Sequence, residues 1–203
     1  MLNGTGAGAP DKEGGNLRAE EQGRATAAAV DDLSFLALAS ALSSSLVRAR
    51  GTQVDEQVRN ALQRIAEFFD ADRGILCAVA HADRRVLVRD CVHRGGANLP
   101  ASGPDAAEIF PWLFDEVVVC GRVVSIPSID RLPPAAVRDR AGLSGWQLRS
   151  ALFVPVSHAD AVEFVLGLGC SRDDPGWTDE TIARLRLLGE TLAGALRHQA
   201  LEQ

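Results

Sequence analysis

The chain has 203 residues, of which 46% are hydrophobic and 24% are charged, and its formal net charge is -6. This length suits one domain with a tail, and this composition is typical of a folded core. The chain has no basic stripe, which argues against nucleic acid as a partner, because phosphate binding needs clustered Lys and Arg. The N-terminus lacks the charged start and apolar run of a signal peptide, and no apolar stretch is expected to cross or bind a membrane. We therefore expect a cytoplasmic protein.

A disordered tail and two helices are predicted for the first third of the chain. Residues 1–29 are rich in Gly, Ala and charged residues and have no large apolar periodicity, which is typical of disorder. Apolar residues then recur at helical spacing over 32–49 and again over 53–69. We therefore divide the chain into a tail, 1–29, and one domain, 30–203.

From residue 73 the apolar pattern changes to a period of two, which predicts strands. Residues 73–81 and 84–93 form a hairpin in this interpretation. The stretch 94–104 is rich in Gly and Pro and is predicted to be a loop. A third helix is expected over 105–118, and a third strand over 122–126.

The remaining elements are a short helix, a second hairpin and a long helix. Pro133 and Pro134 introduce a short helix or turn at 134–141, and alternating apolar residues predict strands at 148–156 and 161–170. A long amphipathic helix follows over 179–201. Thr178 is its expected N-cap, since a threonine hydroxyl can accept a hydrogen bond from a free N–H in the first turn.

Four motifs in this order resemble the GAF domain, the small-molecule sensor module of signalling proteins. They are Phe68-Phe69-Asp-Ala-Asp-Arg-Gly-Ile75, Val123-Val-Ser-Ile-Pro127 with Ile129-Asp130, Leu148-Arg-Ser-Ala-Leu-Phe-Val-Pro-Val156, and Trp177-Thr-Asp-Glu180. The stretches 110–114 and 130–134 resemble the GAF modules placed ahead of sensor histidine kinases and sigma-54-dependent activators. The resemblance runs from about residue 33 to the C-terminus.

The resemblance implies an α+β fold with a central antiparallel sheet of five or six strands. The first, second and last helices would cover one face of the sheet, and segment 94–147 would roof a ligand site on the other. This segment carries four of the ten aromatic residues, and aromatic walls are typical of small-molecule pockets. The four are Phe110, Trp112, Phe114 and Trp146.

Seven residues form the candidate ligand-binding set. Arg149 could hold an acidic ligand through a charge-assisted pair, or it could point at solvent or at an aspartate. The apolar members could equally belong to the core. The set is Phe110, Leu113, Ser125, Ile129, Trp146, Arg149 and Ser150.

Known cofactor signatures of GAF domains do not match this chain, so the ligand is left unidentified. The Asn-Lys pair of cyclic-nucleotide members fails because no lysine follows Lys12. The neighbours of Cys120 do not match a bilin attachment site, and the four histidines, which fall at strand ends, a turn and a helix surface, give no heme signature. The cysteines show no Cys-x-x-Cys spacing, so no metal site is expected.

Three functions remain open at this stage. The first is a regulatory domain without catalysis, which would respond to a small molecule and signal to an effector domain or protein. It would act through a homodimer of the first and last helices, with the residues Leu185, Leu188, Leu192 and Ala195 at the interface. The second is a dimerisation scaffold whose pocket is filled. The third is a thiol enzyme resembling methionine-sulfoxide reductases, which would use Cys77, Cys91 and Cys120. Any kinase or ATPase activity would lie outside this chain.

Overall fold

The computed structural model describes residues 12–51, 53–94 and 105–201, with side chains from residue 28 onward. It divides into two units, residues 1–38 and 39–203. Helix α1 spans Lys12–Arg48 and so begins inside the stretch 1–29 that we expected to be disordered. That stretch is helical from residue 12, because Ala, Glu, Gln and Arg favour helix even without an apolar stripe. The tail expectation for residues 1–11 lies outside the described residues.

The length and apolar composition of part of α1 differ from a second expectation. Residues 28–48 are long and apolar enough to cross a membrane, whereas no stretch was expected to reach that length. Among the described residues no other helix meets this test. The core helix of a soluble protein or a signal sequence can have the same length and composition.

The unit 39–203 is built on an antiparallel sheet of five strands in the order β2-β1-β5-β4-β3. The hairpins β1-β2 and β4-β5 are those predicted from the alternating pattern. The strands are β1 (Arg73–Ala80), β2 (Arg85–His93), β3 (Val124–Ile126), β4 (Ser150–His158) and β5 (Ala161–Cys170). The α+β fold class is therefore confirmed.

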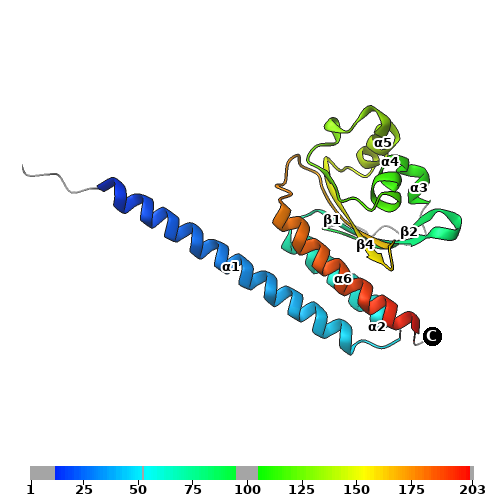
Figure 1. Cartoon of the computed structure of the whole chain (residues 1–203), viewed down its shortest axis with the longest axis horizontal. Helices are drawn as coiled ribbons and strands as arrows, with labels where there is room; N and C mark the ends of the chain where they lie inside the picture. Colours follow the sequence, from blue (N-terminus) through cyan, green and yellow to red (C-terminus); the bar gives the residue numbers. More distant parts are fainter. Residues whose placement is uncertain (1–11, 52, 95–104, 202–203) are drawn as a thin grey trace, which may run out of the picture. The chain divides into compact units, whose positions relative to one another are not determined.

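Two helices cover one face of the sheet (Figure 1). Helix α2 (Gln53–Phe68) contacts β1 and β2, and helix α6 (Asp179–Leu201) contacts β4 and β5. The backbone N–H of Thr181 donates to Thr178 Oγ1 at 3.1 Å, so Thr178 caps α6 as predicted. Three α6 leucines that we placed at a dimer interface are fully buried within the chain instead. They are Leu185, Leu188 and Leu192.

The opposite face is covered by short helices and turns, as expected for the roof, whose residues 95–104 lie outside the described part. The roof elements are α3 (Ala106–Ile109), α4 (Pro111–Leu113), the π-helical turn η2 (Phe114–Val119), η3 (Ile129–Arg131), η4 (Pro134–Ala136) and α5 (Val137–Gly145). The single helix expected over 105–118 is interrupted at Phe110, where φ is -122° and ψ is 62°. The reason is Pro111, which disfavours helical geometry in the residue before it.

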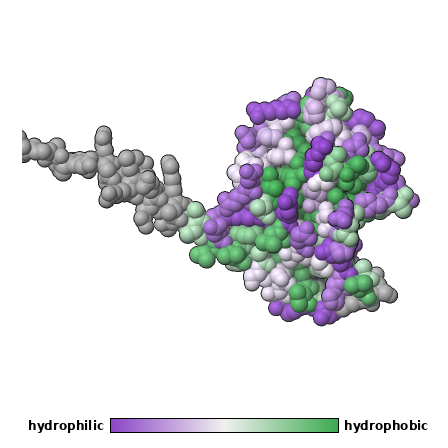
Figure 2. All heavy atoms as spheres, viewed as in Figure 1, coloured by the Kyte–Doolittle hydropathy of each residue, from purple (hydrophilic) through white to green (hydrophobic). Residues whose placement is uncertain are grey.

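The surface of the unit 39–203 mixes polar and apolar residues. Figure 2 shows hydrophilic residues along much of its outline, with apolar residues reaching the surface between them. Such a mixture is ordinary, because apolar atoms contribute more than half of the accessible surface of folded proteins. The interior of the roofed side is therefore more informative than this surface.

Candidate functional site

An apolar cavity of about 50 Å³ lies between the sheet and the roof. Its walls come from strands β1, β2, β4 and β5 below and from α3, α4 and η2 above, together with Trp146 after α5. The lining residues are Ile75, Cys77, Val86, Ala106, Ala107, Phe110, Leu113, Phe114, Val117, Val118, Trp146, Phe153 and Val165. Because these side chains are almost entirely apolar, the cavity suits an apolar group rather than a polar one.

Three of the seven candidate residues meet at this cavity. Phe110 and Leu113 are buried in the roof, and Trp146 closes one side. The rings of Phe110 and Trp146 pack edge to face, with their centroids 4.9 Å apart and their planes at 72°. The two rings form one wall of the cavity, and edge-to-face pairs are favourable beyond simple burial.

The other four candidates do not line the cavity. Ile129 is buried in the core on the roofed side, whereas Ser125 is exposed because its neighbours in β3 point inward and strand side chains alternate. The hydroxyl of Ser150 donates to the Arg172 carbonyl at 2.7 Å. Arg149 pairs with Asp130 at 2.7 Å and with Asp173 at 2.9 Å, which is the aspartate contact considered as its alternative.

The floor of the cavity was not among the candidates. Ile75 and Cys77 alternate along β1 and face the roof, and Val165 of β5 lies beside them in the sheet. The short apolar run over 73–81 predicts a buried strand. It does not show which of the two covered faces each residue meets, since that depends on how the strands pair.

None of the described cysteines forms a disulfide, and three of them are buried. Cys77 lines the cavity, and burial, with a smaller contribution from the neighbouring Cys91, raises the pKa of its thiol to about 12. A thiol with that pKa stays protonated at neutral pH and is a poor nucleophile. Cys120 is exposed at the end of η2.

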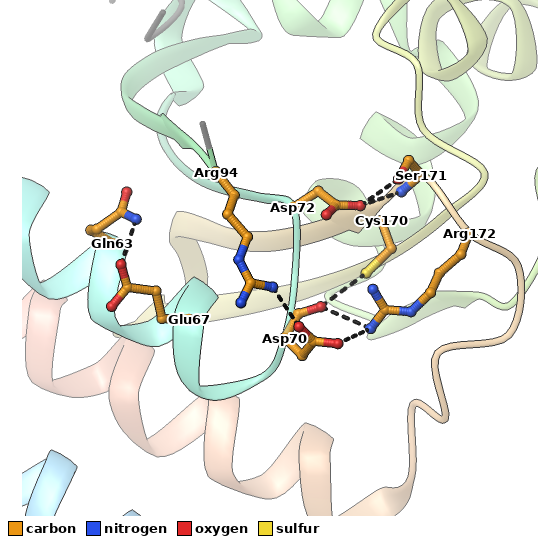
Figure 3. Close-up of polar contacts among 8 residues, drawn as sticks. All are labelled: Gln63, Glu67, Asp70, Asp72, Arg94, Cys170, Ser171 and Arg172. Atoms are coloured by element: carbon orange, nitrogen blue, oxygen red, sulfur yellow. Dashed lines mark hydrogen bonds and ion pairs between the residues drawn. The ribbon is translucent and has the colours of Figure 1, made fainter. Parts of the chain in front are cut away.

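A polar cluster joins the ends of β1, β2 and β5 (Figure 3). The Asp70 carboxylate pairs with both Arg94 and Arg172, and the hydrogen bond from Arg94 is the main reason that the pKa of Asp70 is lowered. Asp72 accepts hydrogen bonds from the backbone N–H and the hydroxyl of Ser171, each at 2.7 Å. The cluster thus anchors the start of the connection from β5 to α6.

The described residues contain no group of three or more His, Cys, Asp or Glu side chains that could hold a metal ion. The candidate site is the apolar cavity between the sheet and the roof.

An antiparallel sheet with two helices on one face and a roofed apolar cavity on the other is the architecture of a small ligand-binding sensory module. The family model of the GAF domain matches residues 53–196, and the chain belongs to the GAF domain family. This confirms the resemblance seen in the sequence. No curated protein matches the chain.

Several solved structures share the fold at low sequence identity. The phycocyanobilin-bound GAF domain of a cyanobacterial phytochrome is 14% identical, has a TM-score of 0.64, and the match covers 83% of this chain and 97% of that one. The GAF domain of an Acinetobacter phosphoenolpyruvate-protein phosphotransferase is 14% identical, with a TM-score of 0.57 and coverage of 82% and 94%. Free methionine-R-sulfoxide reductase from Neisseria meningitidis, solved with its substrate, is 12% identical, with a TM-score of 0.60 and coverage of 83% and 92%.

Proposed function

We propose that this chain is a regulatory domain that responds to a small molecule with an apolar body, bound in the cavity beneath the roof, and that it catalyses no reaction. The observation that carries this proposal is the apolar cavity bordered by Phe110, Leu113 and Trp146. Apolar cavities in proteins stay dry and accept apolar guests such as benzene. A scaffold with a filled pocket would leave no such space.

The size of the cavity links binding to a change in the roof. A volume of about 50 Å³ is small for a metabolite, so most ligands would have to displace α3 or α4 outward. A ligand that binds one arrangement of the roof more tightly than another shifts the population toward that arrangement. A small cavity under a layer of short helices therefore favours a responsive domain.

The connection from β5 to α6 offers a route from the roof to the last helix. Asp173, in this connection, pairs with Arg149, which also pairs with Asp130 of η3. The next residue, Asp174, donates its backbone N–H to the carbonyl of Pro127 at 2.7 Å. A shift of η3 would therefore change the contacts at the start of α6, through which we propose that the domain signals to an effector domain or protein.

Binding can be tested with toluene as a probe, by thermal unfolding. Saturating toluene should raise the melting temperature of the wild type, because a ligand of the folded state stabilises it. Ala107→Leu, which fills the cavity, should abolish this shift. Ala183→Leu, the same change at an exposed position of α6, should keep it. The absence of a shift in the wild type would favour the filled scaffold.

We also propose a homodimer in which α1 rather than the buried leucines of α6 provides the apolar contact. Apolar side chains on α1 with exposed fractions of 58–69% support this: Val30, Leu33, Leu36 and Val47. Sedimentation should show a dimer for the wild type and a monomer for Leu33→Glu, while Ala183→Glu on α6 should not change the association. A wild type that stays monomeric at high concentration would contradict the dimer.

The cellular location is part of the same proposal. We expect a cytoplasmic protein with neither a membrane nor a nucleic acid as partner. Cell fractionation should recover the chain with the soluble proteins. Recovery in membranes after a high-salt wash would contradict this and would assign residues 28–48 as a span.

A further inference from the structure

We propose that the ligand carries an anionic group, such as a carboxylate, which Arg73 and His93 bind at the edge of the cavity. This inference rests on the proposed ligand-binding function and goes further by naming the chemical class of the ligand. Neither residue was a candidate from the sequence. Both hold buried nitrogen atoms for which the described residues offer no hydrogen-bond partner.

Arg73 is the first residue of β1 and faces the roofed side of the sheet. It lies two residues before Ile75 and four before Cys77, both of which line the cavity, so strand alternation places the three side chains on one face. Its guanidinium carbon lies 5.6 Å from the ring centroid of Trp146, which is itself part of the cavity wall. Trp146 is thus shared between the cavity and this cation.

The guanidinium of Arg73 has no acceptor within the described part of the chain. Its Nε and Nη1 atoms are buried and make no hydrogen bond, and no carboxylate pairs with it. The Trp146 ring stabilises the positive charge but does not accept the N–H groups that lie in the guanidinium plane. Buried polar atoms are rarely left unpaired, so an acceptor from outside the chain is the simplest complement.

His93 lies directly beside Arg73. The two residues are paired across β1 and β2, so their side chains project from the same face. The Nδ1 atom of His93 is also buried, and no described residue forms a hydrogen bond with it. On the other side, Arg73 is paired with Gly169 of β5, which adds no side chain. Two nitrogen-bearing side chains therefore share one end of the roofed face.

The neighbouring arginines at this end of the sheet differ from Arg73, because each of them forms an ion pair with an aspartate of the same chain. Arg94 and Arg172 both pair with Asp70 (Figure 3). Arg149 pairs with two aspartates. Of these four arginines, Arg73 is the one to which the described residues offer no carboxylate. A guanidinium favours a planar anion that can accept two parallel N–H bonds.

The ligand class follows from joining the two parts of the site. The cavity suits the apolar part of a ligand. The Trp146 ring belongs to the cavity wall and also contacts the Arg73 guanidinium. A small aromatic or branched aliphatic acid has this division between an apolar body and one carboxylate. Benzoate and toluene form a matched pair of probes, because they share the ring and differ in the carboxylate.

Titration calorimetry with both probes tests the inference. The wild type should bind benzoate at least about tenfold more tightly than toluene, the effect of one charge-assisted hydrogen bond. Arg73→Met should weaken the binding of benzoate by about tenfold and should change the affinity for toluene little. His93→Phe should weaken the binding of benzoate by a smaller factor. Arg186→Met, the same change at an exposed position of α6, should leave the affinities for both probes unchanged.

The outcomes separate this inference from the proposed function. If toluene binds and benzoate binds no more tightly, the proposed anion site is wrong, while the proposed apolar pocket is supported. The same conclusion follows if toluene binds and Arg73→Met leaves the affinity for benzoate unchanged. If neither probe binds the wild type, both proposals fail.

Thermal unfolding without ligand adds a second measurement. Arg73→Met should keep or raise the melting temperature, because it removes two buried nitrogen atoms that have no acceptor among the described residues. A large decrease would show that Arg73 is a structural residue and would overturn the inference.

Discussion

The carboxylate of Asp139, on α5, accepts the backbone N–H of Leu113, on α4, at 2.8 Å. Its second oxygen accepts the N–H of Trp112 at 3.2 Å. These N–H groups lie in the first turn of α4, after Pro111, where no helical carbonyl is available to them. A fully buried side chain of one roof helix therefore caps the next and holds Leu113 at the cavity.

Replacing Asp139 should loosen the roof. Asp139→Ala leaves two N–H groups without an acceptor and should lower the free energy of unfolding by about 2–3 kcal/mol. Asp139→Asn keeps one acceptor oxygen and should cost less. Urea unfolding measures both, with Asp115→Ala at an exposed position as the control. An equal, small effect of all three substitutions would contradict the capping role.

The contact between α5 and Phe110 should be equally sensitive to a single methyl group. A Cβ atom at Gly142 would lie 2.6 Å from Phe110 Cε1 and 2.8 Å from Ile109 Cγ2. Gly142→Ala must push the aromatic wall aside and should destabilise the fold by about 1–3 kcal/mol.

Gly145 is a matched control for that substitution, since it belongs to the same helix and a Cβ there meets nothing within 4 Å. Gly145→Ala should be neutral or should stabilise by up to about 1 kcal/mol, because alanine restricts the unfolded chain more than glycine does. Chemical denaturation measures the free energy of unfolding of both variants. Equal values would show that Phe110 can move aside without a loss of stability.

Asp72 should make stability depend on acid pH. Burial tends to raise the pKa of this carboxyl, but the hydrogen bonds from Ser171 outweigh it, so the folded pKa lies below the ordinary value of 3.8. The stabilisation is therefore fully present above that value and is lost as the pH falls through the folded pKa.

Asp72→Ala should cost about 1–2 kcal/mol at neutral pH, and the difference from the wild type should shrink below pH 3.8. Asp83→Ala, at an exposed position in η1 (His81–Asp83), should change little. Urea unfolding across this pH range is the measurement, and a pH-independent difference would contradict the assignment.

Thiol labelling tests the enzyme alternative. In the folded protein at neutral pH, Cys120 should react rapidly, and Cys120→Ser should remove the fast phase. Cys77 should react only on unfolding, since it is buried and the pKa of its thiol is raised to about 12. Rapid labelling of Cys77 in the native state would favour thiol chemistry in the cavity.

Several elements could be predicted from the sequence because their signals are local. The strand at 161–170 and the helix at 179–201 have the expected boundaries, and Thr178 caps that helix. Alternation and helical spacing are visible within a few residues. The single helix predicted over 105–118 is divided into three short elements, because Pro111 disfavours helical geometry at Phe110.

Local patterns along the chain were enough to predict the family, the order of most elements and three residues of the cavity wall: Phe110, Leu113 and Trp146. The partners of the charged side chains could be seen only in the folded protein. Arg149 meets Asp130 and Asp173, whereas no carboxylate in the described part of the chain pairs with Arg73. The partner of a charge depends on contacts between segments far apart in the chain, while apolar periodicity depends on the segment alone.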